Sequence, residues 1–511
     1  MKTITRRHFV VGAAALGSAL ALGGCGAKPT GSEAPSSEQG ESADIVVIGA
    51  GLAGISAARA AAEQGARVTL VEASASVGPL ISSSPGNLTI VQVPENEEFW
   101  QFESEKADSV ADFLERWRQL TEIGKRDVDY PDYERVKDIM LQTPESIAWL
   151  ESAGLDFMQS GAKERDGMDF VKPDVGDSAS TGGLLISDAF AAEFESLGVN
   201  VMFNTTATQL ICDNGIVKGV RVSQGTKSRD IAAGAVVIAT GGFGASDEWR
   251  AKLIPEVDEA GCQYIGGPLN KGDGMDMALA CGAALYEDGW IIPFYIMPSK
   301  TLVETEASFA DLNMYGTEGA DPGKRLMVNA QGRRFVNEAA GSTELATTMV
   351  DSQNGACYVL FDASDQGIAD ILEKGLATQD LFKAGTIEEL AAESQASELP
   401  AAFSAYQSLC AAGVDDEFSK APESLVPYKD EGPYYLVRYV PTYVATMGGV
   451  KTNEQCQALD ESGSPIEGLY VVGEATHRFM YNRSFVPCAS NSSAIVMGRM
   501  TGEALGAKLS A

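Results

Sequence analysis

The segment from Asp44 to Glu72 constrains this chain most, because it reads as a strand, a glycine turn, a helix and a second strand that ends in an acid. Gly49, Gly51 and Gly54 have the spacing that permits a tight turn, close approach of a pyrophosphate and close helix–strand packing. The free N–H groups at the start of a helix favour an anion. Glu72 follows Gly54 by eighteen residues, where its carboxylate can accept hydrogen bonds from ribose hydroxyls. The segment predicts a βαβ dinucleotide-binding unit; the alternative is a glycine turn without a ligand.

The N-terminal segment has the pattern of an export signal. Arg6 and Arg7 precede an uncharged run from Val10 to Gly24, and Cys25 follows this run. Residues 1–25 match a twin-arginine signal that closes in a lipobox. A transmembrane anchor is the alternative, but the run has about fifteen residues and a bilayer needs ~20. We expect export in the folded state, a lipid on Cys25, and a location at the extracytoplasmic face of the membrane or in the periplasm.

Composition limits the remaining possibilities. Residues 26–42, rich in Ser, Glu, Gly and Pro, are expected to form a flexible tether. The formal net charge of −33 over 511 residues argues against a nucleic-acid partner, which needs a basic patch. The eight cysteines lack the spacing of haem or iron–sulfur sites, and we expect mostly buried thiols. Only two histidines are present, so no metal site is expected.

Further elements of an α/β fold follow the nucleotide unit. Residues 99–154 have apolar residues at spacings of three and four, which predicts helices that pack near the nucleotide domain. Ala235 to Thr240 reads as a buried strand that runs into Gly241 and Gly242. This second strand end with glycines is expected to lie beside the same cofactor.

Several motifs in a fixed order identify a specific resemblance. After the nucleotide unit come TATQLICDNGIVKGV, AVVIATGGFGAS, KGDGMDMALACGAAL, GRRFVNE, TMGGV and GLYVVGEAT. This order resembles the FAD-dependent fumarate reductase and succinate dehydrogenase flavoprotein superfamily, whose relatives include flavocytochrome c fumarate reductases, urocanate reductase and 3-ketosteroid dehydrogenases. The resemblance implies an α/β fold with a Rossmann-like FAD-binding domain of the GR2 type and an inserted α+β capping domain. We expect the FAD-binding domain at 43–254 and 441–511 and the substrate-binding cap at 255–440.

The resemblance also implies which residues hold the cofactor, and no motif for a covalent flavin linkage is present. In relatives, the residue equivalent to Glu72 contacts the adenosine ribose, and the one equivalent to Glu474 contacts the linker between flavin and phosphates. The expected residues around a non-covalent FAD are Gly49, Gly51, Leu52, Ala53, Gly54, Glu72, Ala73, Gly78, Ala207, Thr240, Gly241, Gly473, Glu474, Ser490 and Asn491.

The catalytic residues of the fumarate reductases are mostly replaced. Phe294 stands near the position of one histidine, Ser342 at that of the proton-donating arginine, and Val444 and Ala445 at the HH of an HHTMGG motif. Only the arginine of the NR motif is retained, as Arg483. Several cationic partners are needed to offset the desolvation of a dicarboxylate, so fumarate reduction is not expected.

Aromatic residues replace or flank the missing polar set. Aromatic side chains fill large planar pockets, so together they favour a bulky, flat or aromatic substrate. For each of them the alternative is a place in the core. The residues are Trp290, Phe294, Tyr295, Phe309, Tyr315, Tyr443 and Tyr481.

Four residues are candidates for catalysis. Arg483 is expected to orient a carboxylate or carbonyl and to stabilise the enolate that forms after hydride transfer from flavin N5. Tyr315 and Tyr481 are candidate proton donors, because a phenol can transfer a proton in a dry site. His477 is a further candidate, with a structural role as its alternative.

Three functions remain open. The first is an exported FAD-dependent reductase of the C=C bond of an α,β-unsaturated acid or ketone, a terminal reductase of anaerobic respiration. Its electrons would come from a separate membrane or extracytoplasmic cytochrome or flavoprotein, because the chain has no haem motif. The second is a 3-ketosteroid-type dehydrogenase, which Phe485 at the position of the catalytic tyrosine weakens. The third is a catalytically silent flavin lipoprotein.

Overall fold

The computed structural model describes residues 41–78, 84–100, 102, 109–157, 163–165, 167–176, 181–314, 316–317, 319–353, 357–364 and 366–510. The predicted signal with Cys25, the tether up to residue 40 and the catalytic candidate Tyr315 lie outside these ranges. Within them, the strands form an eight-stranded, a six-stranded and a three-stranded sheet. No helix in these ranges is both long and apolar enough to cross a bilayer.

The eight-stranded sheet, here called the nucleotide sheet, contains the predicted βαβ unit. Six strands follow one another in space as β16 (Gln457–Leu459), β17 (Pro465–Val471), β9 (Lys227–Ile238), β1 (Glu41–Ile48), β2 (Val68–Val71) and β6 (Asn200–Met202). β1 pairs in parallel with β2 and β9, and β17 and β6 continue the parallel order. A hairpin of β7 (Thr206–Asp213) and β8 (Ile216–Gln224) pairs with β9. The Rossmann-like α/β prediction is confirmed.

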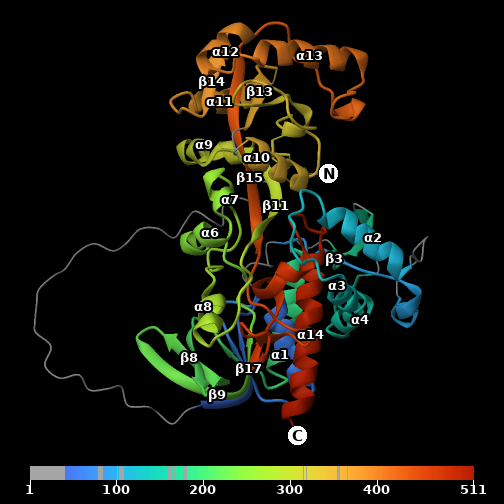
Figure 1. Ribbon diagram of the computed structural model, residues 1–511, viewed down its shortest axis with the longest axis vertical. Coiled ribbons are helices and arrows are strands. Elements are labelled where there is room, and N and C mark those ends of the chain that lie inside the picture. The colour runs from blue at the N-terminus through green and yellow to red at the C-terminus, as the bar shows by residue number, and fades with distance from the viewer. Residues whose placement is uncertain are drawn as a thin grey trace, which may run out of the picture. The chain divides into compact units, whose positions relative to one another are not determined.

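Two helices of this part, α1 (Leu52–Glu63) and α14 (Ala489–Leu509), pack against each other (Figure 1). On α14, Gly498, Gly502 and Gly506 face α1, where a Cβ would lie 2.3, 2.4 and 2.7 Å from successive carbonyl oxygens. Glycine therefore permits this close backbone contact. Later glycines of α14 face later residues of α1, so the two helices run in the same direction. The first two turns of α14 extend beyond the start of α1.

The helices predicted over residues 99–154 are confirmed. They are α2 (Val110–Thr121), α3 (Tyr133–Met140) and α4 (Thr143–Ser152). The side chains of Ser109 and Asp132 accept hydrogen bonds from the first turns of α2 and α3, which satisfies otherwise free N–H groups. Trp117 is fully buried and donates to the Met480 carbonyl at 3.1 Å, so α2 packs on the segment that follows β17.

Shorter elements connect these parts. The three-stranded sheet has the order β3 (Leu88–Thr89), β5 (Met168–Val171), β4 (Lys163–Arg165). The remaining helices outside the cap are η3 (Pro94–Phe99), α5 (Gly182–Phe194), α6 (Asp247–Leu253) and η7 (Gly473–Met480).

The six-stranded sheet forms the core of the predicted cap. Its strands are β10 (Gln263–Tyr264), β11 (Trp290–Pro298), β12 (Met327–Asn329), β13 (Cys357–Asp362), β14 (Leu381–Ala384) and β15 (Tyr434–Met447). The described helices between residues 255 and 440 are α7 (Pro255–Glu259), α8 (Asp273–Ala280), α9 (Lys300–Thr305), η4 (Ala307–Asp311), η5 (Pro322–Lys324), α10 (Ser342–Gln353), α11 (Gln366–Lys374), α12 (Ile387–Ser394), α13 (Leu399–Ala412) and η6 (Pro422–Ser424). Of these, α8 packs against β7 of the nucleotide sheet. Alternate residues of β15 enter two hydrophobic cores, Tyr435 and Val437 in one and Tyr434 and Leu436 in the other.

The long strand β15 joins the cap to the nucleotide part. It pairs with β13 and β14 at its start and with β11 toward its end, where Trp290 lies opposite Met447. Figure 1 shows β15 running from the cap helices toward β17. The predicted domain boundary between residues 440 and 441 falls inside this strand, so the two parts share a continuous backbone element there.

The cysteines differ in part from the prediction of mostly buried thiols. Cys212 on β7 and Cys281 after α8 form a disulfide with a Cα–Cα distance of 6.2 Å. Of the five described free cysteines, only Cys357 and Cys456 are buried. The chain order does not reveal this pairing, because β7 and α8 become neighbours only when the hairpin folds back.

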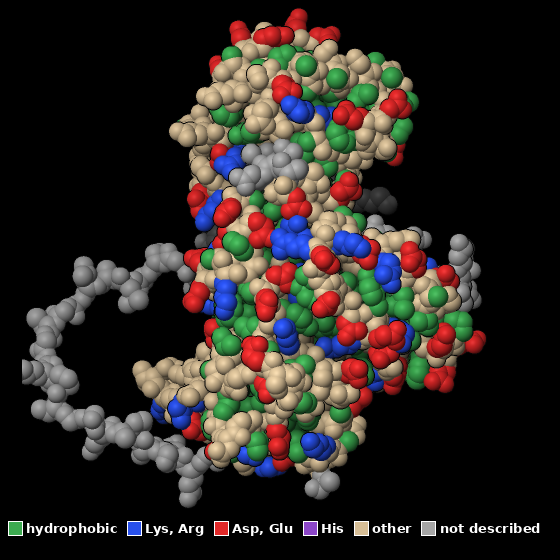
Figure 2. Space-filling model, in the orientation of Figure 1, with side chains coloured by type: hydrophobic (Ala, Val, Ile, Leu, Met, Phe, Trp, Pro, Cys, Tyr) green, Lys and Arg blue, Asp and Glu red, His purple; other side chains and the backbone are tan. Residues whose placement is uncertain are grey.

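Lysine and arginine side chains are scattered among acidic ones on the face shown in Figure 2. The expectation that nucleic acid is not a partner rests on the net charge of −33 and stays a prediction.

Candidate active site

The turn after β1 leaves room for a ligand at the start of α1. Gly49 has φ +100°, and a Cβ there would lie 2.5 Å from the Ala239 carbonyl oxygen. Gly54 likewise permits a close backbone contact, since a Cβ there would lie 1.8 Å from the Gly49 carbonyl oxygen. At Gly51, by contrast, no atom of the residues that the structure describes lies within 4 Å of the Cβ position. Within the described ranges, no side chain caps α1 at its N-cap Gly51, so this helix start fits a pyrophosphate. Leu52 and Ala53 form its buried first turn.

Glu72 is fixed at the end of β2, beside this turn. It is buried, and its two carboxylate oxygens accept hydrogen bonds from Ala50 N–H at 2.7 Å and Ser74 N–H at 2.6 Å. The Gly78 N–H donates to the Ala50 carbonyl, which holds the loop that begins at the exposed Ala73 against the turn. A carboxylate has further lone pairs, so Glu72 fits the ribose role expected of it.

The carboxyl ends of the neighbouring strands bring further predicted residues to the same end of the nucleotide sheet. Thr205 N–H donates to the Glu72 carbonyl at 2.9 Å, which places the buried Ala207 of β7 close to the end of β2. After β9, Gly241 has φ +77°, and a Cβ there would lie 2.8 Å from Asn270 Oδ1. The buried Thr240 Oγ1 has no hydrogen-bond partner among the described residues, which fits a polar group of a bound ligand.

Glu474 connects three strand ends. It follows Gly473 after β17, and its Oε1 accepts from the Thr446 N–H at 2.7 Å and hydroxyl at 2.9 Å. A Cβ on Gly242 would lie 2.1 Å from the same oxygen. Burial raises the pKa of Glu474 to about 7. Thr446 was not predicted as a site residue, although the TMGGV motif contains it.

In the part of the chain that the structure describes, the start of α14 also lacks a side-chain cap hydrogen bond from its N-cap residue. Cys488 at the N-cap has φ +66° and makes no side-chain hydrogen bond to the helix. Ser490 and Asn491 form its first turn, and Asn491 donates to the Asn87 carbonyl at 2.9 Å. The backbone N–H groups of this turn therefore fit an electronegative atom of a ligand.

Tyr481 and His477 lie against this helix start. The Tyr481 hydroxyl is 3.2 Å from Ser490 Oγ, and its ring stacks on Trp117 with centroids 6.0 Å apart. His477 Nε2 is 3.1 Å from Ser493 Oγ. Burial lowers the pKa of His477 to about 4, so its imidazole is neutral at pH 7 and is a poor proton donor. Burial raises the pKa of Tyr481, which keeps its phenol protonated.

Arg483 has different neighbours from Tyr481. Its guanidinium carbon lies 3.6 Å from the centroid of the Trp290 ring, and its Nη1 donates to both carboxylate oxygens of Asp351 at 2.7 Å. The Nε and Nη2 atoms of Arg483 are buried without partners among the described residues, as is Trp290 Nε1. Because Trp290 begins β11 and Asp351 lies on α10, two cap elements cover this arginine.

Trp290 is surrounded by a network of side-chain ion pairs that the sequence did not predict. The Arg126 guanidinium lies 5.8 Å from the Trp290 ring centroid and pairs with Glu256. Its Nη1 is 3.9 Å from Asp288, which pairs with the fully buried Arg478 at 2.8 Å. Arg126 belongs to a loop between predicted helices, and no motif marks it.

The predicted aromatic set is only partly assembled here. Trp290 contacts Arg483, and Tyr443 packs on Tyr264 with ring centroids 5.2 Å apart. Phe309 instead packs in a hydrophobic core of the cap, which is the alternative expected for each of these aromatic residues. Phe294, with 42% of its surface exposed, packs on Tyr295.

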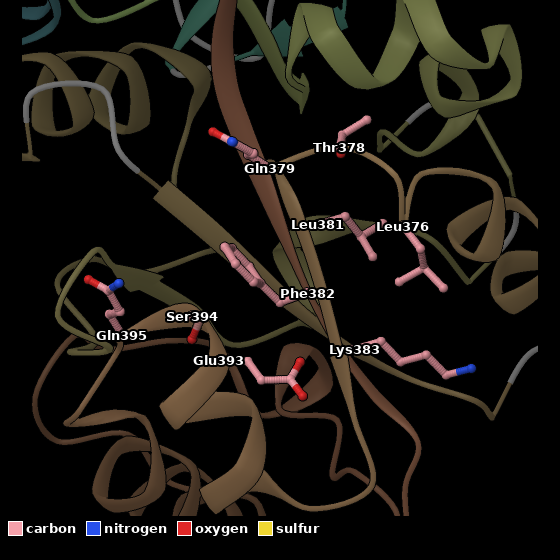
Figure 3. Close-up of a pocket in the computed structure, with 9 residues that line it drawn as sticks. All are labelled: Leu376, Thr378, Gln379, Leu381, Phe382, Lys383, Glu393, Ser394 and Gln395. Carbon is pink, nitrogen blue, oxygen red and sulfur yellow. The ribbon is translucent and has the colours of Figure 1, made fainter.

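A groove of about 690 Å³ lies in the cap along β14 (Figure 3). It is lined by Leu376, Thr378, Gln379, Leu381, Phe382, Lys383, Glu393, Ser394 and Gln395. None of the predicted cofactor or catalytic residues lines it, so this groove is separate from the candidate active site.

Known proteins are similar in sequence to most of this chain. The fumarate reductase (cytochrome) of Shewanella frigidimarina is 26% identical over 473 residues, which cover 91% of this chain and 77% of that protein. The urocanate reductase of Eggerthella lenta is 29% identical over 475 residues, which cover 90% of this chain and 74% of that protein.

A solved structure shares the fold. The 3-ketosteroid-Δ4-(5α)-dehydrogenase of Rhodococcus jostii RHA1 superposes with a TM-score of 0.68 at 21% identity, over 92% of this chain and 98% of that chain. The FAD binding domain family matches residues 44–484, so the glycine turn, Glu72 and Glu474 all lie inside the match. The chain therefore belongs to the FAD binding domain family, within the fumarate reductase and succinate dehydrogenase flavoprotein superfamily, and is an FAD-dependent oxidoreductase that acts on CH–CH or C=C bonds.

Proposed function

We propose that this protein reduces the C=C bond of an α,β-unsaturated acid or ketone of bulky or aromatic shape. The observation that carries the proposal is the state of Arg483, a buried cation between the nucleotide part and the cap. Two of its nitrogens, Nε and Nη2, carry N–H groups that have no hydrogen-bond partner among the described residues. Buried donors without partners are unfavourable, so they point to an acceptor on a ligand.

Bound FAD, held non-covalently, supplies the hydride for such a reduction. Arg483 can direct its Nε and Nη2 N–H groups at the carbonyl or carboxylate oxygen of the substrate. There they stabilise the negative charge that grows on this oxygen as the β-carbon accepts the hydride. Trp290 stacks on the guanidinium at 3.6 Å and restricts its orientation.

The α-carbon of the substrate must then receive a proton. Tyr481 is the candidate among the described residues, because its phenol stays protonated and lies 3.2 Å from Ser490 Oγ at the start of α14. Tyr315 is the second candidate. His477 is disfavoured, because its neutral ring has no extra proton to give.

We further propose that the protein works outside the cytoplasm as a terminal reductase of anaerobic respiration. The twin-arginine pattern and the lipobox at Cys25 support this location, and the Cys212–Cys281 disulfide fits an oxidising compartment. A separate cytochrome or flavoprotein supplies the electrons, since the sequence has no haem-attachment motif.

The test is reoxidation of the FAD-loaded protein, reduced anaerobically with a viologen, by a panel of enoates, aryl-acrylates, unsaturated ketones and unsaturated steroids. We expect rapid reoxidation by one class of planar unsaturated substrate. If no member reoxidises the flavin while saturated ketosteroids reduce the oxidised protein, the dehydrogenase replaces the reductase. Failure of both reactions favours the catalytically silent lipoprotein.

A further inference from the structure

We infer that Asp351 is a specificity-determining residue, which makes the Arg483 site prefer a substrate anchored through a neutral oxygen, such as a ketone or amide, over one anchored through a carboxylate. The inference rests on the proposed function and narrows its substrate class. Asp351 lies on α10 of the cap and was not among the predicted site residues.

The geometry shows that the charge of Arg483 is already balanced. Both oxygens of Asp351 lie 2.7 Å from Nη1 of Arg483. The arginine side chain is 5% exposed and that of Asp351 is 43% exposed. The counter-ion therefore reaches the buried cation from the cap side and keeps contact with solvent.

The surrounding ions leave no spare positive charge in this network. Arg126 pairs with Glu256, Arg478 with Asp288, and Arg483 with Asp351. Each arginine of the described network thus has an acid, and the network is neutral. A substrate carboxylate would add an uncompensated negative charge close to Asp351, and like charges that share a cation are unfavourable.

A neutral oxygen has no such penalty. Nε and Nη2 of Arg483 have no partner among the described residues, and an amide or ketone oxygen can accept from them without adding charge. The same two N–H groups can also grip a carboxylate as a fork. Because solvent partly screens the half-exposed Asp351, the structure predicts a preference, not an absolute exclusion of acids.

The test compares cinnamate with cinnamamide, which share a shape and differ in charge at pH 7. Dissociation constants are measured from the change that each ligand causes in the absorption of the oxidised FAD-loaded protein. We expect the wild type to bind the amide roughly tenfold or more tightly than the acid. In Asp351→Asn, which keeps size but removes charge, Arg483 is left without its counter-ion, and the preference should shift toward the acid by about tenfold or more.

The matched control is Asp138→Asn on α3, which makes the same change in net charge at a side chain that is 66% exposed. It should leave the amide-to-acid ratio unchanged. The inference is overturned if the wild type binds cinnamate as tightly as cinnamamide, if Asp351→Asn leaves the ratio unchanged, or if neither ligand binds. Failure of the proposed function is a different result, because reduced protein would then react with no unsaturated compound in the reoxidation panel.

Discussion

Glu474 accepts two hydrogen bonds from Thr446, one from its backbone N–H at 2.7 Å and one from its hydroxyl at 2.9 Å. The two residues are 28 positions apart and join the turn after β17 to the end of β15. Because β15 begins in the cap, this contact links the cofactor edge of the nucleotide sheet to the cap. The buried carboxyl has a raised pKa, and this has a measurable effect on stability.

The Glu474 carboxyl should make the apoprotein less stable as pH rises. Its folded pKa is about 7 against an ordinary value of 4.5. The folded state therefore binds more proton than the unfolded state between these values, and stability falls over this window. Glu474→Gln has no such carboxyl, so its stability should lack this pH dependence. The free energy of unfolding of the wild type, relative to that of the variant, should therefore fall by up to about 3 kcal/mol from pH 4.5 to 7.5. Urea unfolding at both pH values measures this difference; a difference independent of pH would contradict the prediction.

Arg483→Ala should abolish turnover but leave FAD bound. The described contacts of the arginine are with Trp290 and Asp351, and none of them involves the glycine turn or Glu72, so we expect its loss to remove charge stabilisation and to leave these cofactor-binding residues in place. We expect kcat/KM to fall roughly 10²-fold or more, with an unchanged ratio of flavin to protein absorbance. The control is Arg229→Ala, a half-exposed arginine whose ion pair with Glu41 lies at the far end of the sheet strands. Unchanged turnover in Arg483→Ala would remove this residue from the mechanism.

Gly51→Ala should separate cofactor binding from folding. No atom of the described residues lies within 4 Å of the Cβ position, so the added methyl group meets no part of the chain that the structure describes. It enters the space assigned to the pyrophosphate, and FAD affinity should fall about tenfold or more while apoprotein stability changes little. Equilibrium dialysis with FAD measures the affinity. Gly341→Ala, whose Cβ also meets no described atom within 4 Å, is the control and should retain wild-type affinity.

Loss of the Cys212–Cys281 disulfide should destabilise the protein. The bond closes a loop with a sequence separation of 69, and a bridge over a loop of this size contributes about 2–4 kcal/mol. The double variant Cys212→Ser/Cys281→Ser should lower the free energy of unfolding by this amount under oxidising conditions. Cys410→Ser, at a free cysteine, should have little effect. If oxidised wild-type protein has the same number of titratable thiols as reduced protein, the bond is absent in solution.

The cofactor half could be predicted because its determinants are local. The glycine turn, the first turn of α1 and Glu72 lie within one βαβ unit, where backbone sterics and helix-end N–H groups dictate the residue types. Glu474 and Gly241 follow strands with continuous apolar residues, so their place at a shared sheet edge follows from the parallel order.

The substrate side is decided by tertiary structure. Arg483 is recognisable in its motif, but its neighbours Trp290 and Asp351 are 193 and 132 positions away along the chain. They meet it only because β11 and α10 of the cap fold onto the nucleotide part. The sequence also could not show that Phe309 packs in the cap core or that Arg126 and Asp288 adjoin Trp290. The chain by itself thus determines, through short-range spacing rules, that it binds a dinucleotide, and the order of its motifs implies by resemblance that this dinucleotide is FAD. What surrounds Arg483 depends on long-range packing and charge pairing, which no local pattern encodes.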